Sequence, residues 1–150
     1  MKGEKKMKRF VCALLILCLL PICSNALDLS EFNAMSYVLG ASEIDESKLK
    51  INGKYSGIMQ DGCSIYFIEE SGKLNQINIY GEGDKFLAYC CAAIKMFDPN
   101  GDTTTNHGKL LTMYLLAHMH TEYQAGQTTN GKFFFVEPDE KGFVFMIGES

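Results

Sequence analysis

Apolar residues recur at helical spacing in three parts of the chain. The segments are residues 29–39, 85–97 and 107–123. Asp28 stands where an N-cap is expected, and Gly40 is a natural stop for the first helix. Residues 85–97 (KFLAYCCAAIKMF) carry only two charges and are apolar around most of the circumference. The first and third helices are predicted to have a polar side. The middle helix is predicted to be mostly buried.

Short β-branched and aromatic runs predict five strands. They cover residues 54–59, 63–68, 73–80, 132–137 and 142–147. The order of elements is then α-βββ-αα-ββ, with strands and helices grouped along the chain. Grouping of this kind is typical of the α+β class. We therefore predict an antiparallel sheet of about five strands, a three-stranded meander plus a C-terminal hairpin, packed with three helices.

The C-terminal hairpin is apolar on both faces. In its first strand, Phe133 and Phe135 alternate with Phe134 and Val136, and the second strand shows the same pattern. A strand of this kind must be covered on two sides. Helices supply one cover, and a second layer of the domain or the surface of a partner supplies the other. An internal layer is the commoner arrangement, and we expect it here.

The first 26 residues have the three regions of a secretory signal. Five of the first nine residues are Lys or Arg, an unbroken apolar run covers residues 10–20, and Ser-Asn-Ala (24–26) provides small residues before a cleavage point. A spanning helix needs about 20 apolar residues, which is more than this run contains. We expect residues 1–26 to be removed. The remainder, residues 27–150, is then a single secreted domain without a membrane span.

Removal of the leader makes the protein more acidic. The chain has 14 Lys and Arg and 18 Asp and Glu residues, of which five basic residues and one acidic residue lie in the leader. Nine lysines, no arginine and 17 acidic residues remain, a net charge of −8. Phosphate backbones attract clustered cations, and base recognition relies strongly on arginine. This composition disfavours nucleic acid and anionic membrane surfaces as partners.

Three cysteines, Cys63, Cys90 and Cys91, remain in the secreted part. A bridge from Cys63 to Cys90 or Cys91 would close a loop of nearly thirty residues and add about 3 kcal/mol of stability. The alternative is three reduced cysteines that act as small buried apolar residues. No C-x-x-C pair is present, so the spacing supports neither a redox motif nor a thiolate zinc site.

The loop between the second and third predicted helices carries alternating oxygen ligands. They are Asp98, Asn100 and Asp102, with Asn106 at the ninth position. The spacing resembles the first half of an EF-hand or dockerin calcium loop, which implies a calcium site. Thr103 stands where such loops have glycine, and Lys109 stands where they have a carboxylate. A plain polar turn explains the same residues without a metal.

Other catalytic patterns are weak in this sequence. On a helix, His118 and His120 point in different directions, and His118 with Glu122 gives only two ligands for a zinc ion. No G-x-S-x-G elbow or glycine-rich phosphate loop occurs. We therefore expect a secreted, non-enzymatic domain that binds an extracellular protein or a cell-surface component. The alternative is a small calcium- or zinc-dependent extracellular protein or hydrolase.

Overall fold

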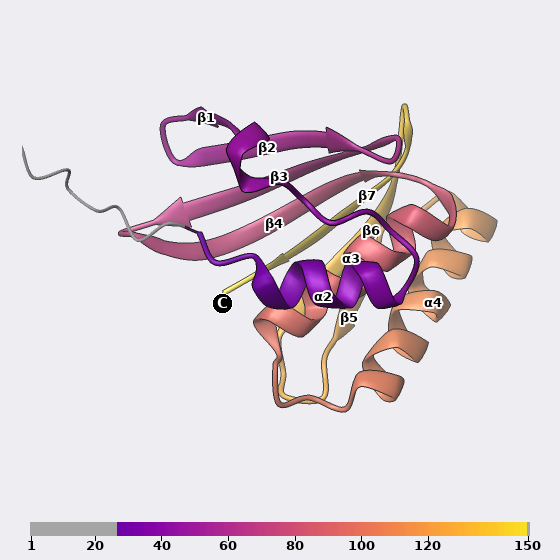
Figure 1. The fold of residues 1–150 in the computed structure, drawn as a ribbon. Coiled ribbons are helices and arrows are strands. Elements are labelled where there is room, and N and C mark those ends of the chain that lie inside the picture. Colours follow the sequence, from indigo (N-terminus) through magenta and orange to yellow (C-terminus); the bar gives the residue numbers. More distant parts are fainter. Residues whose placement is uncertain (1–26, 150) are drawn as a thin grey trace, which may run out of the picture.

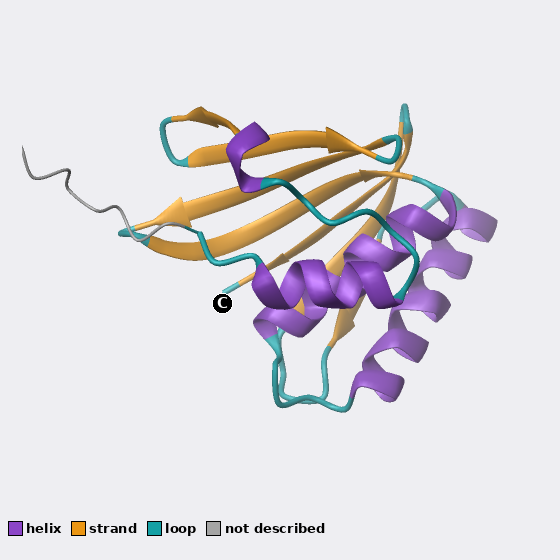
Figure 2. Ribbon diagram, in the orientation of Figure 1, coloured by secondary structure: helices purple, strands orange, loops and turns teal. Residues whose placement is uncertain are grey.

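The computed structural model describes residues 27–149 and confirms the α+β class. Seven strands form one antiparallel sheet in the order β1-β2-β3-β4-β7-β6-β5 (Figure 2). The prediction of about five strands is therefore wrong in number, although the meander and the C-terminal hairpin are both present. The predicted secretory leader, residues 1–26, lies outside the described residues.

The elements have the following bounds. The helices are α2 (Ser30–Val38), α3 (Gly83–Phe97) and α4 (Thr103–His120), with a short 3₁₀ helix η1 (Glu46–Lys48). The strands are β1 (Lys50–Asn52), β2 (Tyr55–Gln60), β3 (Cys63–Glu70), β4 (Lys73–Gly81), β5 (Gln124–Gln127), β6 (Phe133–Asp139) and β7 (Gly142–Gly148). The observed order is α-ββββ-αα-βββ, which adds one strand to each predicted group.

Both missed strands lie at the edges of the sheet. β1 has the sequence KIN and β5 has the sequence QAGQ, so neither shows an alternation of apolar and polar residues. The predicted span of the third helix, 107–123, is also shifted. Helix α4 begins at Thr103 because the Asp102 side chain accepts a hydrogen bond from the Thr105 backbone N–H at 2.6 Å. It ends at His120, since Thr121 adopts a left-handed backbone conformation.

The three helices lie on one face of the sheet (Figure 1). α3 packs on β4 and β7, α2 packs on α3, and α4 packs on β5 and β6. The facing strand residues form the core, and the fully buried ones include Ile65, Phe67, Ile77, Ile79 and Phe145. Nine residues of α3 are buried, as its apolar circumference predicts. Among the described helices, none is both long and apolar enough to cross a bilayer.

The opposite face of the sheet has no second layer in residues 27–149. Phe133 keeps 49% of its surface exposed, whereas its neighbour Phe134 on the helix side is fully buried. The expectation of an internal layer on both faces of the C-terminal hairpin is therefore wrong. Apolar patterning predicted a cover for each face of the hairpin, and within residues 27–149 only the helices provide one.

Candidate binding surface

The uncovered side of the sheet carries a band of aromatic and methionine side chains, and we call this side the open face. Its large apolar members are Tyr55, Met59, Tyr66, Tyr80, Phe133, Phe135 and Met146. Strand register places them there, because Tyr66, Asn78, Met146 and Phe135 stand side by side in one row across four strands. Ile68 and Val144 also lie on this face, because they pair with Gln76 and Tyr80. Alternation turns the residues between the open-face positions, such as Phe67 and Phe145, toward the helices.

Much of this band is in contact with solvent. Met59 is 75% exposed and Tyr66 is 40% exposed. Pairs of rings nevertheless hold the side chains in place. Tyr66 meets Tyr80 edge to face at 5.9 Å, and Tyr123 at the start of β5 stacks on Phe135 at 5.3 Å. These ring contacts restrict the side chains before a partner binds. Less side-chain conformational entropy is then lost on binding, which favours a rigid binding surface.

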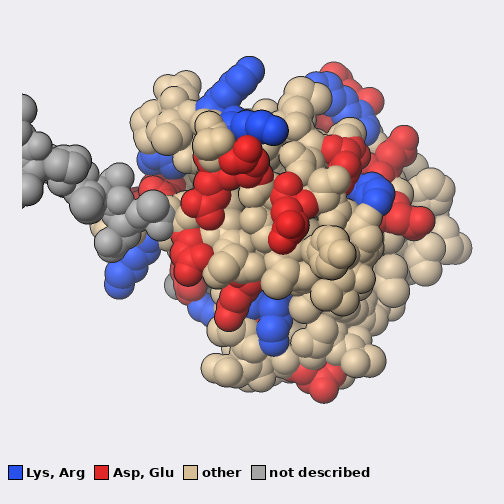
Figure 3. Space-filling model, in the orientation of Figure 1, with Lys and Arg blue, Asp and Glu red and all other residues tan. Residues whose placement is uncertain are grey.

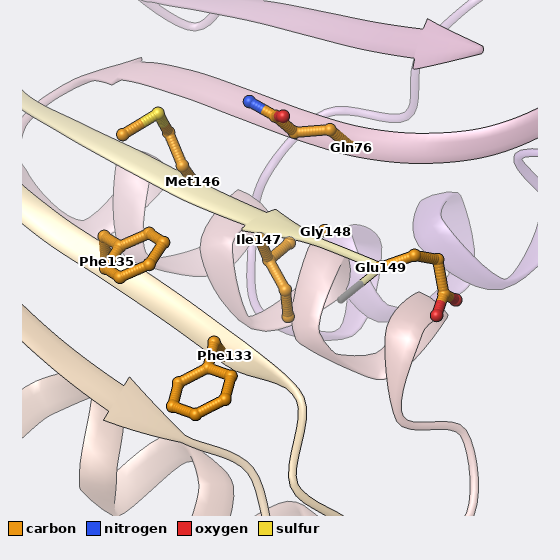
Figure 4. Close-up of a pocket in the computed structure, with 7 residues that line it drawn as sticks. All are labelled: Gln76, Phe133, Phe135, Met146, Ile147, Gly148 and Glu149. Carbon is orange, nitrogen blue, oxygen red and sulfur yellow. The ribbon is translucent and has the colours of Figure 1, made fainter. Parts of the chain in front are cut away.

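A first hollow lies on the open face where β4, β7 and β6 run side by side (Figure 4). Its volume is about 360 Å³. Gln76, Phe133, Phe135 and Met146 line it together with Gly148, whose lack of a side chain leaves the centre open. A Cβ atom at Gly148 would lie 2.9 Å from the Asn75 carbonyl oxygen, so the position does not accept a side chain without movement.

A second hollow, of about 610 Å³, lies at the other side of the open face. It forms because β1 pairs with β2 only as far as Gly57 and leaves the rest of β2 without a neighbour on that edge. Met59, Tyr66 and the lysines Lys48 and Lys50 line it. The Tyr66 ring lies directly over Gly57, where a Cβ atom would come within 2.8 Å of a ring carbon.

The open face has opposite charges at its two sides. Lys50 is exposed on β1, whereas Glu137 and Asp139 lie on β6. Lys48 of η1 lies 3.7 Å from the Asp45 carboxylate, which offsets its charge. The acidic side extends toward the middle of the face. Burial raises the pKa of Tyr80, and the nearby carboxylates of Asp139 and Glu137 raise it further. The face is therefore apolar in the middle, basic at one side and acidic at the other.

Asp98, the first residue of the predicted calcium loop, lies in a buried hydrogen-bond cluster. It is 3% exposed. Asn130 donates its side-chain N–H to the Asp98 carboxylate at 2.6 Å, and Asn106 donates to the other carboxylate oxygen at 3.2 Å. Burial raises the pKa of Asp98, but the hydrogen bonds from Asn130 and Asn106 outweigh it and hold the pKa below its usual value. The cluster joins the α3–α4 loop to the β5–β6 loop.

The other predicted calcium ligands are arranged differently. Asp102 caps α4, Asn100 is exposed, and Asn106 accepts a hydrogen bond from the Thr129 backbone N–H at 2.8 Å. In the part of the chain that the structure describes, no three His, Cys, Asp or Glu side chains are grouped as metal ligands. The sequence signal missed here was Thr-Thr-Asn (128–130), a polar turn that supplies the donors to Asp98.

The histidines and Glu122 do not converge on a site. His118, His120 and Glu122 are exposed near the end of α4, and the His118 ring packs against Phe143 with centroids 5.7 Å apart. His107 lies half-buried in the first half of α4. Burial and the charge of Lys95 both lower the pKa of His107. These positions fit packing and solvation of the imidazoles.

Cys63, Cys90 and Cys91, the cysteines within residues 27–149, are buried free thiols. Burial raises the pKa of Cys63 to about 11 and that of Cys91 to about 12, and it also raises the pKa of Cys90. Nucleophilic chemistry requires the thiolate, which is scarce at neutral pH when the pKa is this high. The geometry therefore gives these thiols no catalytic role.

A second buried polar group joins the helical layer to the β2–β3 turn. The fully buried Tyr89 of α3 donates its hydroxyl to the Asp61 carboxylate at 2.7 Å, and Ser42 donates its backbone N–H to the same carboxylate oxygen at 2.7 Å. Burial and the Asp61 carboxylate raise the pKa of the Tyr89 hydroxyl. Sequence reasoning missed this contact because the two residues are 28 positions apart.

Comparison with known proteins adds no further guide to the site. No family model, curated protein or solved structure matches the chain. The site must therefore be argued from the geometry of the open face itself.

Proposed function

We propose that this protein is a secreted, non-enzymatic binding domain whose open face binds an extracellular protein or a cell-surface component. The observation that carries the proposal is the band of half-exposed aromatic and methionine side chains across the sheet. Tyr, Phe and Met are enriched at protein interfaces because they bury a large area at a small cost in side-chain entropy. Contact of such an apolar surface with water has an unfavourable free energy, and burial against a partner would remove it.

Secretion supports the same proposal. The leader predicts a product that begins at Leu27, and the acidic composition of that product disfavours nucleic acid as a partner. The arrangement of Asp98, the histidines and the cysteines offers no group of converging catalytic side chains among the described residues. Recognition through a surface is then the activity that the geometry supports best.

The test compares serine substitutions on two sides of the molecule. The full chain is expressed with a C-terminal tag, and the secreted product is checked by intact mass for a start at Leu27. It is then immobilised and exposed to extracellular proteins and intact cells of its source. Tyr66→Ser and Phe133→Ser alter the open face, and Tyr37→Ser on α2 is the matched control because Tyr37 is 71% exposed on the helical side.

We expect open-face substitutions to weaken retention of the same partner at least tenfold, equivalent to about 1.4 kcal/mol. The control should retain it fully, and all variants should keep their melting temperatures within a few degrees. Equal retention by all variants would refute the open face as the binding surface. If only Tyr37→Ser lost retention of the partner, the binding surface would lie on the helical side.

A further inference from the structure

We propose that a second copy of this chain binds the open face, in a dimer whose twofold axis runs along the strands between β3 and β4. This inference rests on the proposed function, because it names a partner for the same surface. Two sheets that pack face to face lie about 10 Å apart and cross at about 30°. The open face is complementary to itself in both charge and shape under this symmetry.

Charge complementarity follows from the order of the strands. A twofold interface places one surface patch against its own copy. An axis between β3 and β4 brings β1 of one copy over β6 of the other, since each lies third from the axis in the sheet order. The basic side with Lys50 then faces the acidic side with Glu137, and this pairing occurs twice in the dimer.

The register places these charges within reach of each other. Lys50 stands in the same row as Gly57, Tyr66 and Asn78, and this row continues to Met146 and Phe135. Glu137 lies two residues beyond Phe135 on β6. Two residues of a strand span about 7 Å, which the length of a lysine side chain can bridge.

Shape complementarity comes from the same row. The axis brings β2 of one copy over β7 of the other, and therefore Gly57 over Met146. Met146 is a flexible apolar side chain, and Gly57 borders the second hollow with Tyr66 and Met59. Because the Tyr66 ring covers Gly57, each Met146 would face that ring in the partner copy, beside the second hollow. The Tyr66 ring meets the region of Asn78 near the axis.

The distribution of acidic residues favours a second copy over a strongly basic partner. Figure 3 shows acidic side chains gathered on the side that carries α2 and η1, where Glu31, Asp45 and Glu46 are exposed. The open face itself carries both signs, which suits a partner with the same pair of charged sides.

Charge reversal provides a test that depends on this symmetry. Sedimentation velocity over a range of concentrations compares five samples. They are the wild-type secreted protein, the single variants Lys50→Glu and Glu137→Lys, the double variant, and an equimolar mixture of the two single variants. Glu31→Lys on α2 is the matched control. We expect the wild type and the control to dimerise and each single variant to dimerise at least tenfold more weakly.

The double variant and the mixture should restore the dimer. In the mixture, the glutamate introduced at position 50 of one chain faces the lysine introduced at position 137 of the other, and the natural Lys50 and Glu137 form the second pair. A wild type that remains monomeric to about 100 μM would overturn the proposal. So would single variants that dimerise as well as the wild type, or a mixture that dimerises no better than its components. A monomeric protein that still retains a different partner through Tyr66 would leave the proposed function standing and refute only the dimer.

Discussion

At the scale of single residues, the loop that resembles a calcium site has a structural explanation. The Asp98 carboxylate is occupied by hydrogen bonds from Asn130 and Asn106, and Gly101 leaves the space that the carboxylate fills. Asn100 is exposed and has no part in this cluster. If the loop is a hydrogen-bonded turn, stability depends on Asp98 and not on Asn100. If it is a calcium loop, both residues are metal ligands.

Replacing Asp98 by alanine should lower the free energy of unfolding by about 1–3 kcal/mol, because the buried Asn106 amide and the more exposed Asn130 amide both lose their acceptor. Asn100→Ala is the control and should change it by less than about 0.5 kcal/mol. Urea denaturation with EDTA and with calcium measures both variants. A calcium-dependent loss in both variants would contradict the structural explanation and support a metal loop.

Asp61 gives the protein a predictable response to acid. Hydrogen bonds from Ser42 and Tyr89 lower the pKa of Asp61 below its usual value of about 4. A carboxylate with a lowered pKa stabilises the folded state above the unfolded pKa, and this contribution disappears as the pH falls through the folded pKa. Asp61→Asn should therefore reduce the melting temperature most at neutral pH.

The difference between Asp61→Asn and the wild type should shrink below about pH 4. Tyr89→Phe removes one donor and should reduce the acid dependence in part. Melting curves between pH 7 and pH 2 provide the measurement. A difference that is constant over this range would show that the Asp61 charge is not coupled to folding.

The cysteines can be counted by reaction with a thiol reagent. Burial and the raised pKa values of Cys63 and Cys91 predict that the native protein reacts at least a hundredfold more slowly than the unfolded protein. After unfolding without reductant, three reactive thiols would support the reduced alternative. One thiol would support a bridge from Cys63 to Cys90 or Cys91. Rapid reaction in the native state would contradict the burial.

At the scale of elements, the sequence predicts the strongly patterned segments and misses the short edge strands. α3 and the C-terminal hairpin have long apolar patterns that only one kind of element satisfies. β1 has three residues and β5 has four. They are strands because their backbones pair with β2 and β6, and their side chains show no strand pattern. Local patterns do not contain this information, because the neighbouring strand supplies it.

The candidate surface was predictable only in part. Apolar residues on both faces of residues 132–147 predicted two covers, and the described residues provide only the helical one. The alternation does not say where the helices end, and a helix-covered face and a partner-covered face have similar compositions. Gly148 and Gly57 form hollows through contacts between strands, and these contacts are visible only once the register is known.

Gly148→Ala should destabilise the protein by about 1–2 kcal/mol, because its Cβ atom would press against the Asn75 carbonyl oxygen. Gly108→Ala is the matched control. Gly108 lies in α4, and a Cβ atom added there would meet no packing neighbour within 4 Å, so alanine should stabilise the helix by up to about 1 kcal/mol. Chemical denaturation of both variants tests the register of β7 against β4. Equal changes in the free energy of unfolding for the two variants would contradict this register.

At the scale of the whole molecule, one layer of helices on one face of a seven-stranded sheet explains both stability and the proposed binding. The helices bury one side of the sheet and leave the other open, where we propose that a partner binds. A surface of this kind should be accessible in the isolated protein and protected in the assembly. The predicted leader would place the proposed assembly outside the cell.

Oxidative footprinting of the secreted protein over a dilution series tests this central claim most directly. At high dilution, Met59, Tyr66 and Phe133 should be oxidised about as readily as the exposed Tyr37 on α2. At high concentration or with a bound partner, the three open-face residues should become protected while Tyr37 remains reactive. Protection of the open-face residues at every dilution would show that the chain covers them itself, and reactivity under all conditions would show that no partner binds there.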